Sequence, residues 1–337
     1  MKKINRKKAA YLLMFVGILL LIFGVVTSVS LGAKDIDLAT IVNSILHDSN
    51  DINTKIIRDV RIPRAIAAAL VGGFLAVAGA IIQGITRNPI AEPSVMGITQ
   101  GATFMIAVAL VLQRIFPDLI INSFSMMMFA FAGASISGLL VYFVSSRSMR
   151  KVDPVKLALA GTALGTLLIS LAMGISMYFN LSQQLTFWIS GGVTGAKWSS
   201  ITLLAIIGGC ALVGAILMAP KITILSLGEE VAIGLGQKTN QVRFISIVLV
   251  ILLTGASVSV AGNIVFVGLI IPQIVRGIVG ADYKYIIPSS MVLGSVLLVY
   301  SDILARMINP PYETPIGSLT ALLGVPVFIY LVRKDTK

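Results

Sequence analysis

Charge and cysteine are scarce in this chain. Only 12% of its 337 residues are charged, whereas soluble domains carry about 25%, so a soluble globular fold is excluded. The single cysteine, Cys210, rules out an intrachain disulfide. The single histidine, His47, cannot form a metal site alone. By contrast, 57% of the residues are hydrophobic and the mean hydropathy is +0.97, which indicates a polytopic membrane protein.

Catalytic and energy-coupling motifs are also missing. No HExxH motif, nucleophile elbow or carboxylate pair appears, and residues 234–239, GLGQKT, lack the spacing of a phosphate-binding loop. Ion-coupled transporters place ionisable side chains at mid-membrane. Here Asp302 and Arg306 lie near the external end of an expected crossing, and no charged residue falls at the middle of one. We therefore expect a transporter subunit rather than an enzyme, with no cofactor or metal of its own. The net charge of +12 lacks an Arg/Lys stripe with interleaved aromatics, so no nucleic-acid partner is expected.

Uncharged runs predict the membrane crossings. Two runs, 157–196 and 244–275, are too long for one helix of about 20 residues. The first breaks near Asn180, and the second at Gly262 and Asn263. We predict an all-α polytopic fold with one transmembrane domain over residues 1–337 and about ten helices. Their expected bounds are 11–32, 63–84, 94–113, 121–145, 156–178, 199–219, 242–262, 263–279, 286–306 and 316–332.

The distribution of charge predicts the orientation. With a cytoplasmic N-terminus and ten crossings, the inside segments hold 18 basic and 6 acidic residues, and the outside segments hold 8 of each. Splitting 157–196 into two crossings would instead export Lys221, Lys238 and Arg243. Both termini are therefore expected in the cytoplasm. The basic start resembles a signal peptide, but residues 9–33 are too long an uncharged run for one. We expect a retained first helix, with cleavage as the alternative.

A short external segment, 187–198, reads FWISGGVTGAKW. Its two tryptophans suit a membrane interface. Its glycines allow non-helical backbone, which is tolerated at membrane depth only where protein or a water cavity covers it. The segment is either an ordinary interfacial loop or an external gate over a pore.

A cytoplasmic segment, 226–236, reads SLGEEVAIGLG. Ser226 and Glu229 have the spacing of a capping box, and Gly236 suits the end of a helix. An apolar stripe of Val231, Ala232 and Leu235 predicts a short amphipathic helix against the cytoplasmic face. The helix could rest on lipid headgroups, but its two glutamates favour a protein partner.

Five blocks read RIPR (61–64), QGITRNPIAEPSVMGITQGA (83–102), LGEEVAIGLG (227–236), AGNIVFVGLIIPQIVR (261–276) and ARMINPPYETPIGSLTALLGVPVF (305–328). Together they resemble the FecCD-type family, the permease subunits of ABC importers for ferric siderophores and vitamin B12. The resemblance covers essentially the whole chain in the family's order, and it implies a vitamin B12 permease-like fold. The family often has Pro and His where this chain has Asn263 and Gln273, which affects the turn or the ATPase contact.

The resemblance also implies partners and site residues. It implies a second permease subunit, as a homodimer or heterodimer, a cytoplasmic ABC ATPase dimer that binds ATP and Mg²⁺, and an extracytoplasmic substrate-binding protein or lipoprotein. Glutamates of the binding protein would pair with Arg61, Arg64 and Arg306 at the outer face; Arg58 is a weaker candidate. Segment 226–236 would be the coupling helix, with Gly228, Glu229, Glu230, Ala232 and Gly236 as the ATPase contacts.

The resemblance implies uptake of a ferric siderophore across the bacterial cytoplasmic membrane by ATP-driven alternating access. Cobalamin and haem importers share these motifs and remain alternatives within the family. An ion-coupled secondary transporter is a remote alternative, because the mid-membrane carboxylates that would support it are missing. A receptor or scaffold without transport is a further alternative, which the coupling segment disfavours.

Overall fold

The computed structural model describes residues 6–32, 38–47, 51–118, 121–147, 151–152, 154–310 and 312–335. Within these ranges the chain is almost entirely helical, which confirms the predicted all-α membrane fold. Eight of the described helical stretches are long and apolar enough to cross a membrane. They are α1 (Arg6–Ser30), α4 (Ile62–Thr86, continuous with α3 and η1), α5 (Ile98–Ile115), α6 (Ser123–Ser145), α7 (Pro154–Tyr178), α9 (Trp198–Ser226), α11 (Thr239–Ala261) and α13 (Tyr283–Met307).

Two shorter apolar helices, α12 (Val267–Val279) and α14 (Ile316–Asp335), complete the ten predicted segments. The remaining described elements are small. They are α2 (Leu38–Leu46), α3 (Ile52–Lys55), the π-helix η1 (Ile56–Arg61), the 3-10 turn η2 (Pro93–Met96), α8 (Ser182–Ser190), α10 (Glu229–Gly234) and a two-residue hairpin, β1 (Ser146–Arg147) with β2 (Lys151–Val152).

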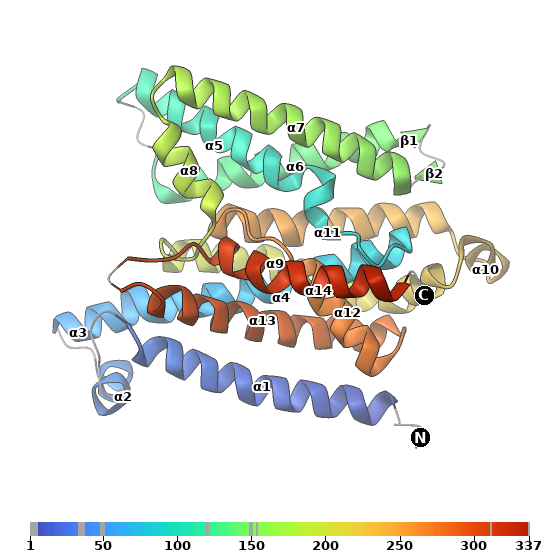
Figure 1. Ribbon diagram of the computed structural model, residues 1–337, viewed down its shortest axis with the longest axis horizontal. Helices are drawn as coiled ribbons and strands as arrows, with labels where there is room; N and C mark the ends of the chain where they lie inside the picture. Colours follow the sequence, from blue (N-terminus) through green and yellow to red (C-terminus); the bar gives the residue numbers. More distant parts are fainter. Residues whose placement is uncertain are drawn as a thin grey trace.

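The long helices lie side by side as one bundle with two distinct ends (Figure 1). One end carries α2 and α3. The other carries α10 and the β1–β2 hairpin, and there α1 begins and α14 ends. We call these the external and the cytoplasmic end, following the orientation that the charge distribution predicts. The first and last helices thus start and finish on the same side as the coupling segment, in agreement with that prediction.

Helix α4 is the centre of the bundle. It packs against α13, α11, α9 and α12, and the window of highest hydropathy in its span is 83% buried. Glycines allow these contacts because they have no side chain to hold the helix backbones apart. Close packing matters here, since lipid provides no hydrophobic effect that would drive the helices together. A Cβ on Gly72 would overlap the carbonyl oxygen of Gly294, and one on Gly79 would overlap that of Gly268.

Two helices begin inside the bundle rather than at its surface. α5 starts at Ile98, four residues later than predicted, and α12 starts at Val267 after a non-helical stretch in which Phe266 has φ +68°. The carboxylate of Glu92 accepts a hydrogen bond of 2.6 Å from the backbone N–H of Phe266. This bond connects the non-helical break after α4 to the start of α12. A carboxylate suits this place, since the N-terminus of a helix carries partial positive charge.

Gln273 belongs to the same internal network. Its side-chain amide donates to Gln83 Oε1 at 2.8 Å and to the carbonyl oxygen of Pro89 at 2.7 Å. Gln273, where the family often has His, therefore connects α12 to the break after α4.

Candidate functional site

The arginines predicted for docking lie at the external end, where η1 runs into α4. The backbone hydrogen bonds of a π-helix span one residue more than those of an α-helix, and such turns are frequent at functional sites. Arg61 ends η1, and Arg64 lies in the first turn of α4 after Pro63. Arg306 approaches from the last turn of α13. Each of the three has a side chain that is largely buried.

Arg64 is held by two carboxylates. Its Nη2 lies 2.8 Å from Asp302 Oδ1 and its Nε lies 2.9 Å from the same atom, while its Nη1 lies 2.6 Å from Glu313 Oε1. Asp302 is fully buried and also pairs with Arg306, at 3.2 Å from its Nη2. The Nε of Arg64 also lies 3.2 Å from Asp302 Oδ2, so two donors of one guanidinium group bond this carboxylate. Hydrogen bonds between charged groups are roughly twice as strong as neutral ones.

Arg61 and Arg306 also cap the end of α1. Arg61 Nη1 donates to the carbonyl oxygens of Val29 and Ser30, each at 2.8 Å. Arg306 donates to Ser28 Oγ at 2.8 Å and to the carbonyl oxygen of Leu31 at 3.1 Å. The last carbonyls of a helix have no partner within the helix, and basic side chains near that end satisfy them and favour the helix dipole.

The structure therefore does not present Arg61, Arg64 and Arg306 as an open basic surface. Their guanidinium groups bond to carboxylates and carbonyl oxygens of this chain. We call Arg61, Arg64, Arg306, Asp302 and Glu313 the external arginine cluster. Sequence reasoning placed Asp302 near an external end but missed Glu313 as a partner, although Glu313 is the sole acidic residue of the block 305–328.

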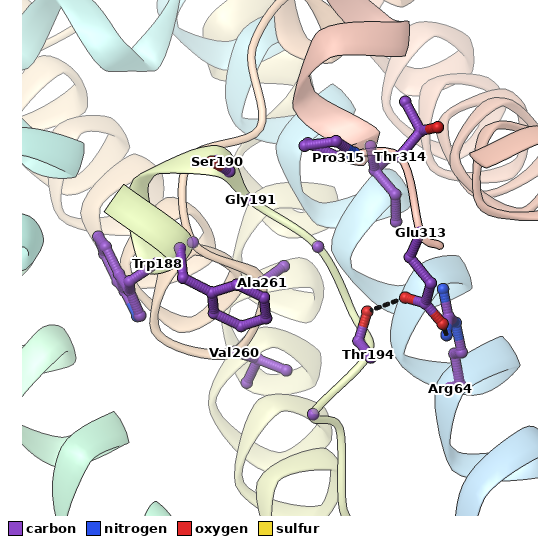
Figure 2. Close-up of a pocket in the computed structure, with 15 residues that line it drawn as sticks. Arg64, Trp188, Ser190, Gly191, Thr194, Val260, Ala261, Glu313, Thr314 and Pro315 are labelled. Carbon is purple, nitrogen blue, oxygen red and sulfur yellow. Dashed lines mark hydrogen bonds and ion pairs between the residues drawn. The ribbon is translucent and has the colours of Figure 1, made fainter. Parts of the chain in front are cut away.

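The predicted external segment lies beside this cluster (Figure 2). Its first part, 187–190, is the end of α8, and only 191–197 is non-helical before α9 begins at Trp198. A cavity of about 480 Å³ lies under it. The cavity is lined by Arg64, Phe187, Trp188, Ser190, Gly191, Gly192, Thr194, Gly195, Val260, Ala261, Gly262, Glu313, Thr314, Pro315 and Ile316.

Two hydrogen bonds hold the non-helical stretch, and a third holds Trp198 directly after it. Gly192 N–H donates to the carbonyl oxygen of Ala261 at 2.8 Å. Thr194 Oγ1 donates to Glu313 Oε2 at 2.5 Å, the dashed line in Figure 2. Trp198 Nε1 donates to the carbonyl oxygen of Arg58 at 2.9 Å. Glu313 thus links the external segment to Arg64.

Glu313 is charged under ordinary conditions. Partial burial alone would raise the pKa of its carboxyl. The hydrogen bonds from Arg64 and Thr194, together with the positive charges of Arg64 and Arg306, outweigh burial and hold that pKa below its ordinary value. The ionised carboxylate is therefore the form that bonds Thr194.

The predicted coupling segment contains a short helix, α10, at the cytoplasmic tip of the molecule (Figure 1). The predicted capping box is wrong: Ser226 ends α9, where its hydroxyl donates to the carbonyl oxygen of Thr223 at 2.7 Å. The N-cap is Gly228, with φ +140°. The predicted end is confirmed, because Gly236 has φ +78° and closes a Schellman motif, with Gln237 N bonded to the carbonyl oxygen of Ala232 at 2.9 Å.

The side chains of this segment divide into internal and exposed sets. Glu229 pairs with Arg243 of α11 at 3.0 Å, and Ala232 is completely buried, so both face this chain. Glu230 is exposed. The predicted apolar stripe is wrong for Val231 and Leu235, which are exposed rather than packed on the molecule. The exposed apolar side chains are Leu227, Val231, Ile233 and Leu235.

Arg87 is a further residue at this surface that sequence reasoning did not assign. It is exposed at the end of α4 with φ +52°. A surface cavity of about 450 Å³ lies between Arg87 and the coupling segment, and Leu227, Gly228, Glu229, Glu230, Val231 and Ile233 complete its lining. The lining combines three apolar side chains with the charged Arg87, Glu229 and Glu230. Nothing in its lining resembles a catalytic site.

Comparisons with known proteins agree with this architecture. The profile of the FecCD transport family matches residues 20–334. The chain is 46% identical to the Iron(3+)-hydroxamate import system permease protein FhuB of Bacillus subtilis over 334 residues, covering 99% of this chain and 86% of that protein. It is 34% identical to the Hemin transport system permease protein HmuU of Yersinia pestis, covering 94% of both chains.

A solved structure agrees as well. The chain is similar to one described as an inward-facing conformation of a metal-chelate type ABC transporter, with a TM-score of 0.82 and 28% sequence identity. The match covers 95% of this chain and 98% of the other. The arrangement of helices is thus shared along nearly the full length.

Proposed function

The chain belongs to the FecCD transport family, the permease subunits of ABC importers, and we propose that it translocates a ferric siderophore across the bacterial cytoplasmic membrane. In this proposal it forms a pore with a second permease subunit, as a homodimer or a heterodimer. An ABC ATPase dimer docks on the cytoplasmic end. An extracytoplasmic binding protein or lipoprotein delivers the chelate to the external end.

One observation supports this substrate above the others. The permease that is 46% identical over nearly the whole chain is an iron(3+)-hydroxamate importer subunit. A haem importer subunit is also related, at 34% identity, so haem is the second candidate. Cobalamin is a third, carried by the family resemblance alone.

The cytoplasmic end supports coupling to a separate ATPase. Four exposed apolar side chains, Leu227, Val231, Ile233 and Leu235, lie on the short helix or next to it. Burying one such side chain contributes about 1.5–3 kcal/mol. ATP and Mg²⁺ would bind in that ATPase, and its closure would move the coupling segments. We propose Gly228, Glu230 and Gly236 with these apolar side chains as the contact surface, and Glu229 and Ala232 as its internal support.

The external end supports a gate. The non-helical stretch 191–197 covers a cavity, and the hydrogen bond from Thr194 to Glu313 is the contact that would break during transport. Alternating access would open this end while the cytoplasmic end is closed, and the reverse. Arg61, Arg64 and Arg306 remain our proposed docking residues, with the restriction that their present partners must rearrange.

Transport by the reconstituted complex tests this function. The permease, its partner permease if there is one, and the ATPase would be placed in proteoliposomes with ATP inside. The loaded binding protein would be added outside. We expect accumulation of radioactive iron from a ferric hydroxamate, with haemin and cobalamin tested in parallel.

The controls separate the alternatives. A non-hydrolysable ATP analogue should abolish accumulation. Uptake of haemin or cobalamin in place of the ferric hydroxamate would transfer the assignment to that substrate. Accumulation by the permease alone, driven by a proton or sodium gradient, would contradict the proposal for the whole class.

A further inference from the structure

We propose that Glu313 occupies a carboxylate site on Arg64 that an acidic side chain of the docking binding protein takes over, and that this exchange releases Thr194 and opens the external segment. The proposal rests on the proposed function, since it needs a protein that docks at the external end. It adds a mechanism by which docking at the surface reaches the gate. Arg64, Glu313 and Thr194 form the continuous chain of contacts that carries it.

The two carboxylates on Arg64 differ in accessibility. The side chain of Asp302 has no exposed surface, whereas that of Glu313 is 39% exposed. Asp302 is also held on its other oxygen by Arg306. An incoming group can therefore reach and replace Glu313 without disturbing the buried pair beneath it.

The charges of the cluster favour exchange over simple loss. Arg61, Arg64 and Arg306 carry three positive charges, and Asp302 and Glu313 carry two negative ones. If Glu313 swung away unreplaced, Asp302 alone would face three guanidinium groups in a largely buried site. Leaving a buried charge without its partner is strongly unfavourable, so Glu313 leaves readily only when another carboxylate takes its place.

The segment combines two buried side chains with an exposed tip. Val193 is completely buried and Ala196 is 6% exposed, whereas Thr194 and Gly195, which form the tip, are exposed. The hydroxyl of Thr194 bonds Glu313. Added Cβ atoms at Gly192 and Gly195 meet nothing closer than Thr194 Oγ1 at 3.8 Å, so the backbone at these two glycines is not crowded. The ends stay fixed by the Gly192–Ala261 and Trp198–Arg58 hydrogen bonds. Loss of the Thr194 bond would therefore free the exposed tip, Thr194 and Gly195, both of which line the 480 Å³ cavity.

The affinity of the permease for the binding protein tests the exchange, because the proposal predicts that removing a side chain of the permease strengthens binding. The permease–ATPase complex in nanodiscs would be titrated with the loaded binding protein. If Glu313 competes for Arg64, Glu313→Gln and Glu313→Ala should bind about tenfold more tightly, the scale of one charge-assisted hydrogen bond. Glu313→Asp should restore the wild-type affinity in part.

A spin label in the external segment tests the second step of the proposal, the release of Thr194. Gly195→Cys introduces a side chain into open space, and the exposed Cys210 would first be changed to Ser. In this background the label should become more mobile when the binding protein docks. Thr194→Val, which keeps every charge, should make it mobile without docking. It should also raise the affinity, but by less than Glu313→Gln does, because only one of the bonds that hold Glu313 is lost.

The outcomes are separable. Unchanged or weaker binding by both Glu313→Gln and Glu313→Ala, in complexes with wild-type thermal stability, would overturn the exchange. A label that stays immobile in Thr194→Val would overturn the role of that bond. Failure of the unaltered complex to bind its binding protein would instead count against the proposed function.

Discussion

The external arginine cluster and the cytoplasmic coupling segment handle their polar and apolar side chains in opposite ways. At the external end the charged groups face inward and bond one another and the end of α1. At the cytoplasmic end Ile233 and Leu235 are more than half exposed. The cytoplasmic surface is thus ready for an apolar partner as it stands. The external surface must exchange bonds before a charged partner can engage it.

This difference agrees with the work proposed for each end. An ATPase that stays attached through many cycles is held well by apolar burial, which persists whatever the ionic strength. A binding protein that must arrive and leave is better served by charge pairs, which speed encounter and set specificity more than they add affinity. The predictions below test the contrast, from the largest expected effect to the smallest.

Removing Arg64 should have the largest effect. Arg64→Ala leaves the buried carboxylate of Asp302 with a single partner, Arg306, and breaking a buried ion pair costs about 3–5 kcal/mol. Thermal unfolding in nanodiscs should therefore show a marked loss of stability. Arg87→Ala, at an exposed arginine, is the control and should change little. Equal stability of the two variants would mean that the external cluster does not hold the helices together.

Placing charge on the coupling segment should come next. Ile233→Asp or Leu235→Asp removes an exposed apolar side chain worth about 1.5–3 kcal/mol when buried against a partner. The ATPase should bind about ten- to a hundredfold more weakly, measured by co-purification and titration, with the stability of the permease unchanged. Lys238→Ala, at an exposed position nearby, is the control. Normal assembly of the charged variants would remove these side chains from the interface.

Substitutions of the adjacent glutamates should distinguish a residue that supports α10 from one that contacts the ATPase. Glu229 pairs with the buried Arg243, whereas Glu230 is exposed. Glu229→Gln should leave ATPase binding intact and lower substrate-stimulated hydrolysis about twofold to fivefold, because a weakened ion pair lets α10 move independently of α11. Glu230→Gln should change binding rather than coupling. The double variant Glu229→Arg with Arg243→Glu should recover part of the loss; no recovery would argue against a pairwise role.

Acidification should have the smallest effect over the usual range. The pKa of Glu313 lies below its ordinary value, so the stability that its carboxylate adds is fully present above that ordinary value and is lost as the pH falls through the lowered one. The spin label at position 195 should therefore keep the same mobility from neutral pH to about pH 5. It should become mobile only in more acidic solution. A transition near neutral pH would mean that another group controls the segment.

The crossings and the two functional segments could be read from the sequence because they depend on local composition. Uncharged stretches and their breaks placed all ten apolar helices, and the end of the coupling helix at Gly236 followed from its glycine. Helix starts were less accurate where tertiary contacts decide them. α5 begins at Ile98 and α12 at Val267 because both start within the bundle, against Gly161 and Glu92 respectively.

By itself, the sequence determined that this chain crosses a membrane many times, in which orientation it is expected to lie, and which family it resembles. Only the tertiary structure decided which charges are free. Arg64 and Asp302 lie 238 positions apart, and no local pattern pairs them. Glu229 and Glu230 are neighbours, yet one faces Arg243 and the other faces outward. Hydropathy is a property of each segment, whereas the partner of a charge depends on which helices the fold brings together.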